Sequence, residues 1–135
     1  MIQGLDHAAV CVSDIPKAVA FYCDVLGMRV VDSRPPETSP YLWLNFGPGQ
    51  TLNLTLAPEQ TPKKLAQETG LDLSAHLAFR APRSFLDQLK PKLAGLDLLR
   101  HESATGLYFA DPDGNYLEVT CWREHALEEA GQAHW

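Results

Sequence analysis

Cysteine is scarce in this chain, and the three that are present, Cys11, Cys23 and Cys121, lie far apart without Cys-x-x-Cys spacing. An odd number of widely spaced cysteines is not the pattern of a disulfide-stapled extracellular domain. It is typical of a protein in a reducing cytoplasm, where free thiols behave as small hydrophobic side chains. The sequence therefore predicts a cytoplasmic protein with buried thiols.

Long apolar runs and a surplus of positive charge are also missing. No apolar stretch is long enough to cross a bilayer, and no signal-peptide pattern precedes the first expected strand. The net charge of −6 argues against nucleic acid or an anionic membrane surface as the main partner.

The chain contains a pattern that occurs twice. Its first half opens with "LDHAAVCV", which alternates with the two-residue period of a strand. A helix should follow, capped by Ser13 or Asp14, with Pro16 in its first turn and Gly27 at its end. Three further strands are then expected at about residues 28–33, 40–46 and 51–57.

The second half repeats this order. It begins with the strand "SAHLAFRA" and continues with a helix that starts at Pro82 and that Pro91 should kink or shorten near its end. Strands are expected at about residues 95–101, 105–110 and 115–122. Since a half this small cannot bury its own sheet, the two halves should pair. The predicted fold class is α+β, with two βαβββ modules.

These patterns also predict the domain organisation. At 135 residues the chain fits one domain made of two small modules. We expect a single domain over residues 1–122, followed by a tail that forms a short helix or frays. Its parts are module one at 1–58, a polar linker at 59–72, module two at 73–122 and the tail at 123–135.

Three polar side chains fall at matching places of the two halves. His7 lies 20 residues before Gly27, and His76 lies 19 residues before Gly95. Matching Gly49 to Gly114 places Asn53 opposite Glu118. Strand alternation then places both histidines and Glu118 on the face that the helices do not cover.

Each of these residues has an ordinary explanation when it is considered alone. A histidine in a strand can be hydrogen-bonded in the core, and Glu118 can pair with Arg80 or Arg123 or face solvent. As a set, His7, His76 and Glu118 are two imidazoles and one carboxylate. Such a set holds a divalent metal and leaves coordination positions open for a substrate.

Three stretches carry a resemblance to a known family: "LDHAAVCVSDIPKAVAFYCDVLGMRVV", "HLAF" and "YFADPDGNYLEV". Over about residues 3–122 the chain resembles the vicinal oxygen chelate superfamily. Its members include glyoxalase I, extradiol dioxygenases, fosfomycin-resistance thiol transferases and bleomycin-binding proteins. The resemblance implies paired βαβββ modules whose curved sheets enclose a metal. It also implies a homodimer, with module pairing either within a chain or between chains.

The resemblance assigns roles by position. His7 matches the ligand of the first strand, His76 the histidine that opens module two, and Glu118 the carboxylate of the last strand. Asn53 stands where glyoxalase I has a fourth, acidic ligand. Because an asparagine cannot act as the base, this position argues against glyoxalase I activity. The remaining three ligands look like those of the dioxygenases and the fosfomycin-type transferases.

Two further residues are candidates for catalysis. Tyr108 lies ten residues before Glu118, similar to the tyrosine beside the metal of extradiol dioxygenases, although it also fits as an aromatic that lines the sheet. His101 could donate or accept a proton near the substrate, although a histidine at a strand end can simply be solvated.

The candidate substrate-binding residues are mostly aromatic and include few basic side chains, which favours a flat or partly aromatic substrate. Arg80, with Arg34 and Arg100 as further candidates, is a small supply of cations for a phosphonate. The predicted substrate-binding residues are Tyr41, Trp43, Asn53, Arg80 and Tyr116.

The leading hypothesis is a metal-dependent enzyme that chelates two adjacent oxygens of a small substrate. Ring-cleaving oxygenation with Fe²⁺ is its first version, and a glyoxalase-type lyase or isomerase or a thiol transferase with Zn²⁺, Ni²⁺ or Mn²⁺ is the alternative. A different class, a binding or resistance protein that sequesters its ligand without chemistry, stays open. So does a protein that binds metal but no longer turns over.

Overall fold

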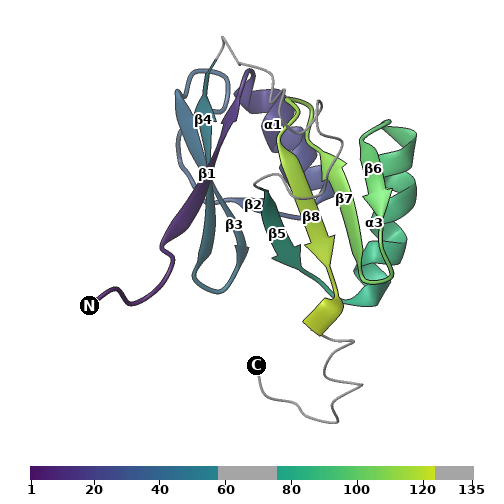
Figure 1. The fold of residues 1–135 in the computed structure, drawn as a ribbon. Helices are drawn as coiled ribbons and strands as arrows, with labels where there is room; N and C mark the ends of the chain where they lie inside the picture. The colour runs from purple at the N-terminus through teal and green to yellow at the C-terminus, as the bar shows by residue number, and fades with distance from the viewer. Residues whose placement is uncertain (58–75, 124–135) are drawn as a thin grey trace. The chain divides into compact units, whose positions relative to one another are not determined.

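The computed structural model describes residues 1–57 and 76–123, and the chain divides into two units, Met1–Pro62 and Lys63–Trp135. Each unit contains a four-stranded mixed sheet (Figure 1). The linker predicted at 59–72 and the tail beyond Arg123 lie outside the described residues. Among the described helices, none combines the length and the apolar character needed to span a membrane.

The sheet of the first unit has the strand order β1-β4-β3-β2. Strand β1 runs parallel to β4, and the other neighbouring strands are antiparallel. Two helical segments, α1 and η1, connect β1 to β2. The elements are β1 (His7–Val12), α1 (Ile15–Ala20), η1 (Phe21–Val25), β2 (Arg29–Val30), β3 (Tyr41–Gly47) and β4 (Gln50–Leu56).

The second unit repeats this topology, with the strand order β5-β8-β7-β6 and a parallel pair β5 and β8. Helix α3 packs against strands β6, β7 and β8 (Figure 1). The elements are β5 (Leu77–Arg80), α3 (Arg83–Gly95), β6 (Leu99–Glu102), β7 (Gly106–Ala110) and β8 (Tyr116–Thr120). The predicted fold class, α+β with two βαβββ modules, is confirmed.

The predicted apolar face of each sheet forms the core. In the long strands, residues on this face are almost completely buried, as the alternation predicted. Phe46 and Leu56 are 36% and 37% exposed, because both lie near strand ends. The buried residues on this face are Val10, Val12, Leu42, Leu44, Leu52 and Leu54 in the first unit and Leu107, Phe109, Leu117 and Val119 in the second.

The prediction of buried thiols is confirmed for Cys121 but is wrong for Cys11. Cys121 is buried, Cys23 is partly buried and Cys11 is exposed. Cys11 alternates with the buried Val10 and Val12 and so lies on the other face of β1.

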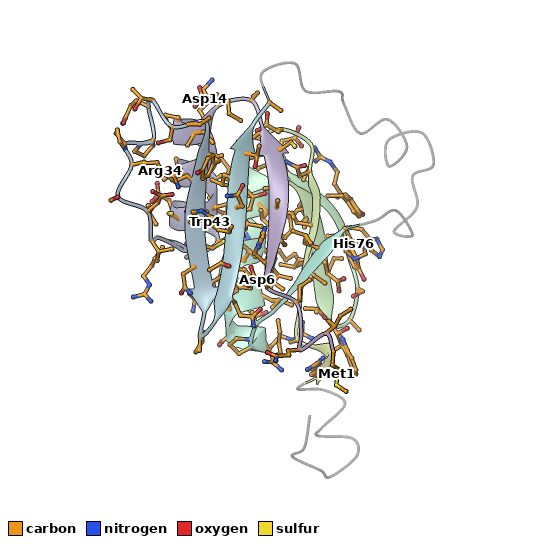
Figure 2. All side chains as sticks on the ribbon, turned by 90° about the vertical axis from the view of Figure 1, so that its left-hand side faces the viewer. Met1, Asp6, Asp14, Arg34, Trp43 and His76 are labelled. Carbon is orange, nitrogen blue, oxygen red and sulfur yellow. The ribbon has the colours of Figure 1, made fainter. Side chains whose placement is uncertain are left out.

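The first helix begins as predicted but changes type after its first turns. Asp14, which Figure 2 labels, is the N-cap, because the Lys17 amide donates to its carboxylate at 2.9 Å. From Phe21 to Val25 the chain is a π-helix rather than the expected α-helix, with the Leu26 amide bonded to the Phe21 carbonyl. This wider turn lets Phe21 and the adjacent Tyr22 both be buried.

Of the two effects expected of Pro91, a kink or a shortened helix end, the shortening does not occur. Helix α3 continues past Pro91 to Gly95. Proline removes one backbone hydrogen bond, but Leu89 and Leu93 on either side are buried, and this packing holds the helix together. As a result, the next strand starts at Leu99 instead of at about residue 95.

Strand β2 is shorter than the predicted strand at 28–33 because the Asp32 side chain, rather than a backbone carbonyl, accepts a hydrogen bond from strand β3. The Val31 amide still donates to the Trp43 carbonyl at 3.0 Å. The Trp43 amide, however, donates to the Asp32 carboxylate at 3.3 Å rather than to a backbone carbonyl. The ladder ends there, and the chain leaves the sheet as the loop that leads to β3.

Candidate functional site

The two proposed ligands of the second unit face each other. His76 immediately precedes β5, and Glu118 lies in the middle of β8. The His76 Nε2 and Glu118 Oε2 atoms are 3.0 Å apart, and the two side chains are 22% and 13% exposed. A carboxylate buried to this degree needs a partner. The sequence allowed Arg80, Arg123 or solvent as that partner, and the structure provides His76.

Aromatic rings surround this pair. Tyr108 lies directly opposite Glu118 in the ladder of β7 and β8. Its ring is stacked on that of Tyr116, with centroids 6.4 Å apart, and the His76 ring contacts both edge-on. His101 reaches Tyr108 with ring centroids at 5.5 Å. We call His76, His101, Tyr108, Tyr116 and Glu118 the unit-two cluster.

Arg80 is the remaining predicted site residue of this unit. It is exposed at the end of β5, opposite Thr120 of β8. Ala78, which lies between His76 and Arg80 on the same face of β5, pairs with Glu118. Arg80 therefore shares the face of the unit-two cluster and lies two residues along β5 from Ala78, the residue opposite Glu118.

The third proposed ligand, His7, lies at the start of β1 in the first unit. Its Nδ1 atom is 2.7 Å from the Asp6 carboxylate, and its ring meets Trp43 edge-on at 4.9 Å. An imidazole whose Nδ1 donates to a carboxylate has its Nε2 lone pair available for a metal. The sequence reasoning missed Asp6, although an acid directly before a proposed histidine ligand is a readable signal.

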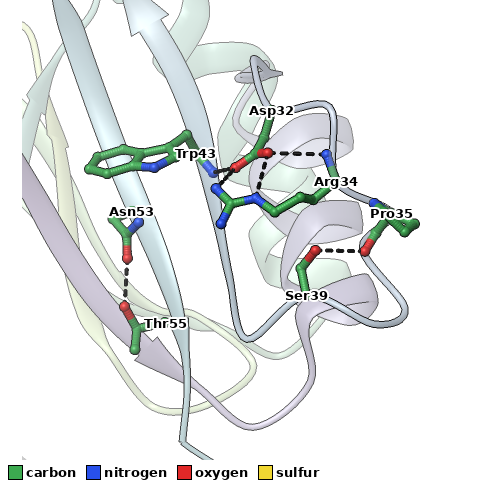
Figure 3. A network of polar contacts seen from close by, with 7 residues as sticks. All are labelled: Asp32, Arg34, Pro35, Ser39, Trp43, Asn53 and Thr55. Atoms are coloured by element: carbon green, nitrogen blue, oxygen red, sulfur yellow. Dashed lines mark hydrogen bonds and ion pairs between the residues drawn. The ribbon is translucent and has the colours of Figure 1, made fainter.

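Asn53 is 7% exposed and pairs with Ala9 on one side and Trp43 on the other. The Thr55 hydroxyl donates to the Asn53 side-chain oxygen at 2.5 Å (Figure 3). A neighbour in its own strand thus satisfies the amide oxygen. Its predicted contact with a substrate stays a prediction.

Arg34 is bound within the first unit. Its Nε donates to Asp32 Oδ1 at 2.8 Å, and its Nη2 donates to Asp32 Oδ2 (Figure 3). Its guanidinium lies 3.9 Å above the Tyr41 ring. These hydrogen bonds lower the pKa of Asp32 to about 2 and raise the pKa of Arg34. Arg100, the other candidate cation, donates to the carbonyls of Asp97 and Leu99.

The strand register agrees with the repeat found in the sequence. Asn53 pairs with the residue two after His7, and Glu118 pairs with the residue two after His76. Gly49 and Gly114, which the sequence matched, both adopt a positive φ, at 66° and 80°. Asn53 and Glu118 therefore occupy equivalent positions, as do Trp43 and Tyr108, their partners in the ladder.

The chemistry of these donors fits a divalent metal. An imidazole nitrogen and a carboxylate oxygen that face each other at 3.0 Å are ligands of the kind that divalent first-row metals accept. Among residues 1–57 and 76–123, the structure contains no group of three or more His, Cys, Asp or Glu that could hold a metal ion. The second unit supplies two proposed ligands and the first supplies one, so the complete set stays a prediction.

A family model for the Glyoxalase/Bleomycin resistance protein/Dioxygenase superfamily matches residues 4–119. The chain belongs to this superfamily. The match covers both βαβββ units and includes all three proposed ligands. The resemblance that the sequence motifs indicated is therefore confirmed at the level of the family.

Relatives in the superfamily include a metallothiol transferase, FosB, from Shouchella clausii. It is 34% identical over 127 residues, which cover 88% of this chain and 80% of the relative. A crystal structure of a glyoxalase/dioxygenase from Nostoc punctiforme is similar at 25% identity and a TM-score of 0.71, over 88% of this chain and 90% of that one.

The fosfomycin resistance protein FosX from Listeria monocytogenes shares the fold. The structure of a mutant form of FosX, in complex with Mn(II) and 1S,2S-dihydroxypropylphosphonic acid, has a TM-score of 0.67 at 20% identity. The similarity covers 90% of this chain and 93% of that one.

Proposed function

We propose that this chain is a divalent-metal-dependent enzyme that acts on a small organic substrate through two adjacent substrate oxygens. His7, His76 and Glu118 would hold the metal, which when bound would polarise these oxygens as a Lewis acid. The observation that carries the proposal is the His76–Glu118 pair at 3.0 Å. Glu118 lies at the repeat position where the first unit has a neutral amide, Asn53.

The other residues of the proposed site have separate tasks. Tyr108 and His101, whose rings are in contact, would move a proton to or from the substrate. Tyr116 would bind the substrate through its flat apolar ring, as would Tyr41 and Trp43 of the first unit. Arg80 would attract a negative substrate oxygen.

Among the reaction classes, we propose transfer of a thiol to an electrophilic carbon of the substrate. In this reaction a sulfur–carbon bond forms, a carbon–oxygen bond breaks, and the released oxygen takes up a proton. The FosB relative, a metallothiol transferase at 34% identity, supports this choice over the oxygenation that the sequence favoured first. The substrate need not be a phosphonate, since Arg34 is paired with Asp32 and Arg100 with backbone carbonyls.

Ring-cleaving oxygenation with Fe²⁺ is the second candidate. It is favoured by the placement of an ionisable tyrosine and a histidine beside the proposed ligands, with Tyr108 opposite Glu118 and His101 against Tyr108. The glyoxalase/dioxygenase structure from Nostoc punctiforme, at 25% identity, supports it as well.

The first test is the metal content of the protein purified anaerobically without added metal. We expect about one Mn, Fe, Ni or Zn per chain, lost in His7→Ala, His76→Ala and Glu118→Ala. His125→Ala is the matched control, since it removes a histidine outside the proposed set. A native protein that holds no metal and takes up none on reconstitution would leave a ligand-binding protein as the better explanation.

The second test separates the two reactions. The metal-loaded protein is incubated with a thiol and a panel of small epoxides while free thiol is measured, and separately with catechols while oxygen uptake is measured. Thiol loss that requires both partners and disappears in Glu118→Ala supports transfer. Oxygen uptake without thiol consumption would contradict transfer and support the second candidate.

A further inference from the structure

Gly106 begins β7 and is buried directly beside the Glu118 carboxylate. A Cβ atom built on Gly106 would lie 3.0 Å from Glu118 Oε1 and 3.4 Å from the Ser103 hydroxyl. A carbon and an oxygen in van der Waals contact prefer a few tenths of an ångström more, so one of them would have to move. The carboxylate is thus the nearest neighbour of the space at position 106, and a side chain there would press against it.

The backbone around Gly106 is fixed by hydrogen bonds. The Gly106 carbonyl accepts from the Ser103 amide at 2.9 Å. The carbonyl of Thr105 accepts from the Cys121 amide at 2.8 Å and from the Thr120 hydroxyl at 3.0 Å. Because hydrogen bonds hold the backbone at both Thr105 and Gly106, the flexible end of the Glu118 side chain would be the part that moves.

Conformation does not explain the glycine. The described glycines with a positive φ are Gly27, Gly49 and Gly114, and Gly106 is not among them. Its backbone therefore lies outside the left-handed region that favours glycine. What position 106 requires is therefore the absence of a side chain.

The first unit shows the alternative arrangement of the same strands. Tyr41 lies opposite Thr55 there, as Gly106 lies opposite Thr120. Asn53 stands at the Glu118 position, and its oxygen accepts from Thr55. In the second unit the equivalent Thr120 hydroxyl instead donates to the backbone carbonyl of Thr105. In the first unit, where Tyr41 occupies this position, the Asn53 amide oxygen bonds within its own strand. In the second unit, where Gly106 occupies it, the Glu118 carboxylate faces His76.

We infer that Gly106 is a positioning residue for Glu118. Its missing side chain gives the carboxylate the room to face His76, and so to bind the metal together with it. The inference rests on the proposed function, because it takes Glu118 to be a metal ligand. Metal–ligand distances tolerate only about 0.2 Å of deviation, which is less than the shift that a methyl group at 106 would demand.

The test compares Gly106→Ala with Gly95→Ala, a control whose added Cβ would meet nothing within 4 Å. Mn²⁺ affinity is measured by competition with a chelating dye, and the thermal midpoint is measured on metal-free protein. We expect Gly106→Ala to weaken Mn²⁺ binding by about tenfold to a hundredfold, the size of effect seen when the support of a metal ligand is lost. Gly95→Ala should bind like the wild type.

The same glycine change in a Glu118→Ala background separates positioning from general damage. With no carboxylate to displace, Gly106→Ala should change neither the residual Mn²⁺ affinity nor the thermal midpoint. If Gly106→Ala alone fails to fold, recovery of the fold in the double variant supports the inference, and failure in both overturns it.

The remaining outcomes distinguish the inference from the function on which it rests. Wild-type protein that binds no Mn²⁺, Fe²⁺ or Zn²⁺ would overturn the proposed metal site itself. Wild-type protein that binds Mn²⁺, with Gly106→Ala binding equally well, would overturn the role of Gly106 and leave the metal site standing.

Discussion

At the scale of single residues, the Asp32 carboxylate shows how strongly one ion pair can organise a loop. It accepts from the Arg34 side chain, from the Arg34 amide and from the Trp43 amide. It therefore ends strand β2 and at the same time holds Arg34 over the Tyr41 ring. The pair fixes two of the proposed substrate-binding aromatic residues, Tyr41 and Trp43, without itself belonging to the proposed metal site.

This pair predicts a pH dependence of stability. Hydrogen bonds from Arg34 lower the pKa of Asp32 from 3.8 to about 2, so the unfolded chain takes up this proton first as the pH falls. The contribution of the pair to the free energy of unfolding is complete above about pH 5 and is lost progressively as the pH falls through about 4 towards 2. Asp32→Asn should abolish it.

Urea unfolding between pH 2 and pH 6 measures this effect. The difference between wild type and Asp32→Asn should be largest at pH 5 to 6 and should shrink towards pH 2. Asp87→Asn, which removes an exposed carboxylate from α3, is the control. A difference between wild type and Asp32→Asn that stays constant over this range would contradict the assignment.

Tyr108 allows a prediction about catalysis. Tyr108→Phe keeps the ring that stacks on Tyr116 but removes the hydroxyl. If this group moves a proton in the reaction, kcat should fall by about a hundredfold or more. Mn²⁺ affinity should stay unchanged, because Tyr108 is not a proposed ligand. An unchanged kcat would remove Tyr108 from the proposed mechanism.

At the scale of elements, the first helix depends on its cap. The Asp14 carboxylate accepts from the Lys17 amide, which has no partner within the first turn of the helix. Asp14→Ala should lower the free energy of unfolding by about 1 kcal/mol, and Asp14→Asn should keep most of it. Equal urea midpoints for both variants would show that the cap contributes little.

The element scale also shows what the sequence could predict. The order of the strands, the positions of the long strands and the start of both helices followed from local patterns, because period-two alternation and an Asp or Pro at a helix start act through neighbouring residues. The π-turn at Phe21, the uninterrupted helix across Pro91 and the early end of β2 at Asp32 did not follow. Each of them depends on packing or on a hydrogen bond to a residue distant in the sequence.

At the scale of the whole chain, the internal repeat predicted which strand positions of the two units are equivalent. Matching Gly49 with Gly114 was enough to place Asn53 and Glu118 at equivalent positions, which the strand register reproduces. The Asp6 contact and the space at Gly106 could not be predicted in this way. Both depend on where a side chain ends, and alternation gives only the face of the strand on which it begins.

The proposed ligands come from both units, which leads to a test by mixing variants. If the protein is a homodimer in which module one of one chain completes the site of the other, His7→Ala and Glu118→Ala chains should complement each other. Refolded together, they should recover about a quarter of the wild-type Mn²⁺ sites, since half the dimers are mixed and each has one intact site.

Each variant refolded alone is the control and should recover none. Size-exclusion chromatography with light scattering gives the number of chains per particle in the same samples. Dimers without any recovered sites would place all three ligands of a site on one chain.

The neutral amide at position 53 has a consequence for charge balance. Two imidazoles and one carboxylate leave a bound divalent ion with one uncompensated positive charge, and a second acid would have cancelled it. Because Asn53 is an amide, the first unit adds no negative charge at this position, and the amide oxygen already accepts from Thr55. The metal and its ligands in the proposed centre would therefore reach zero net charge only when the substrate binds as a monoanion.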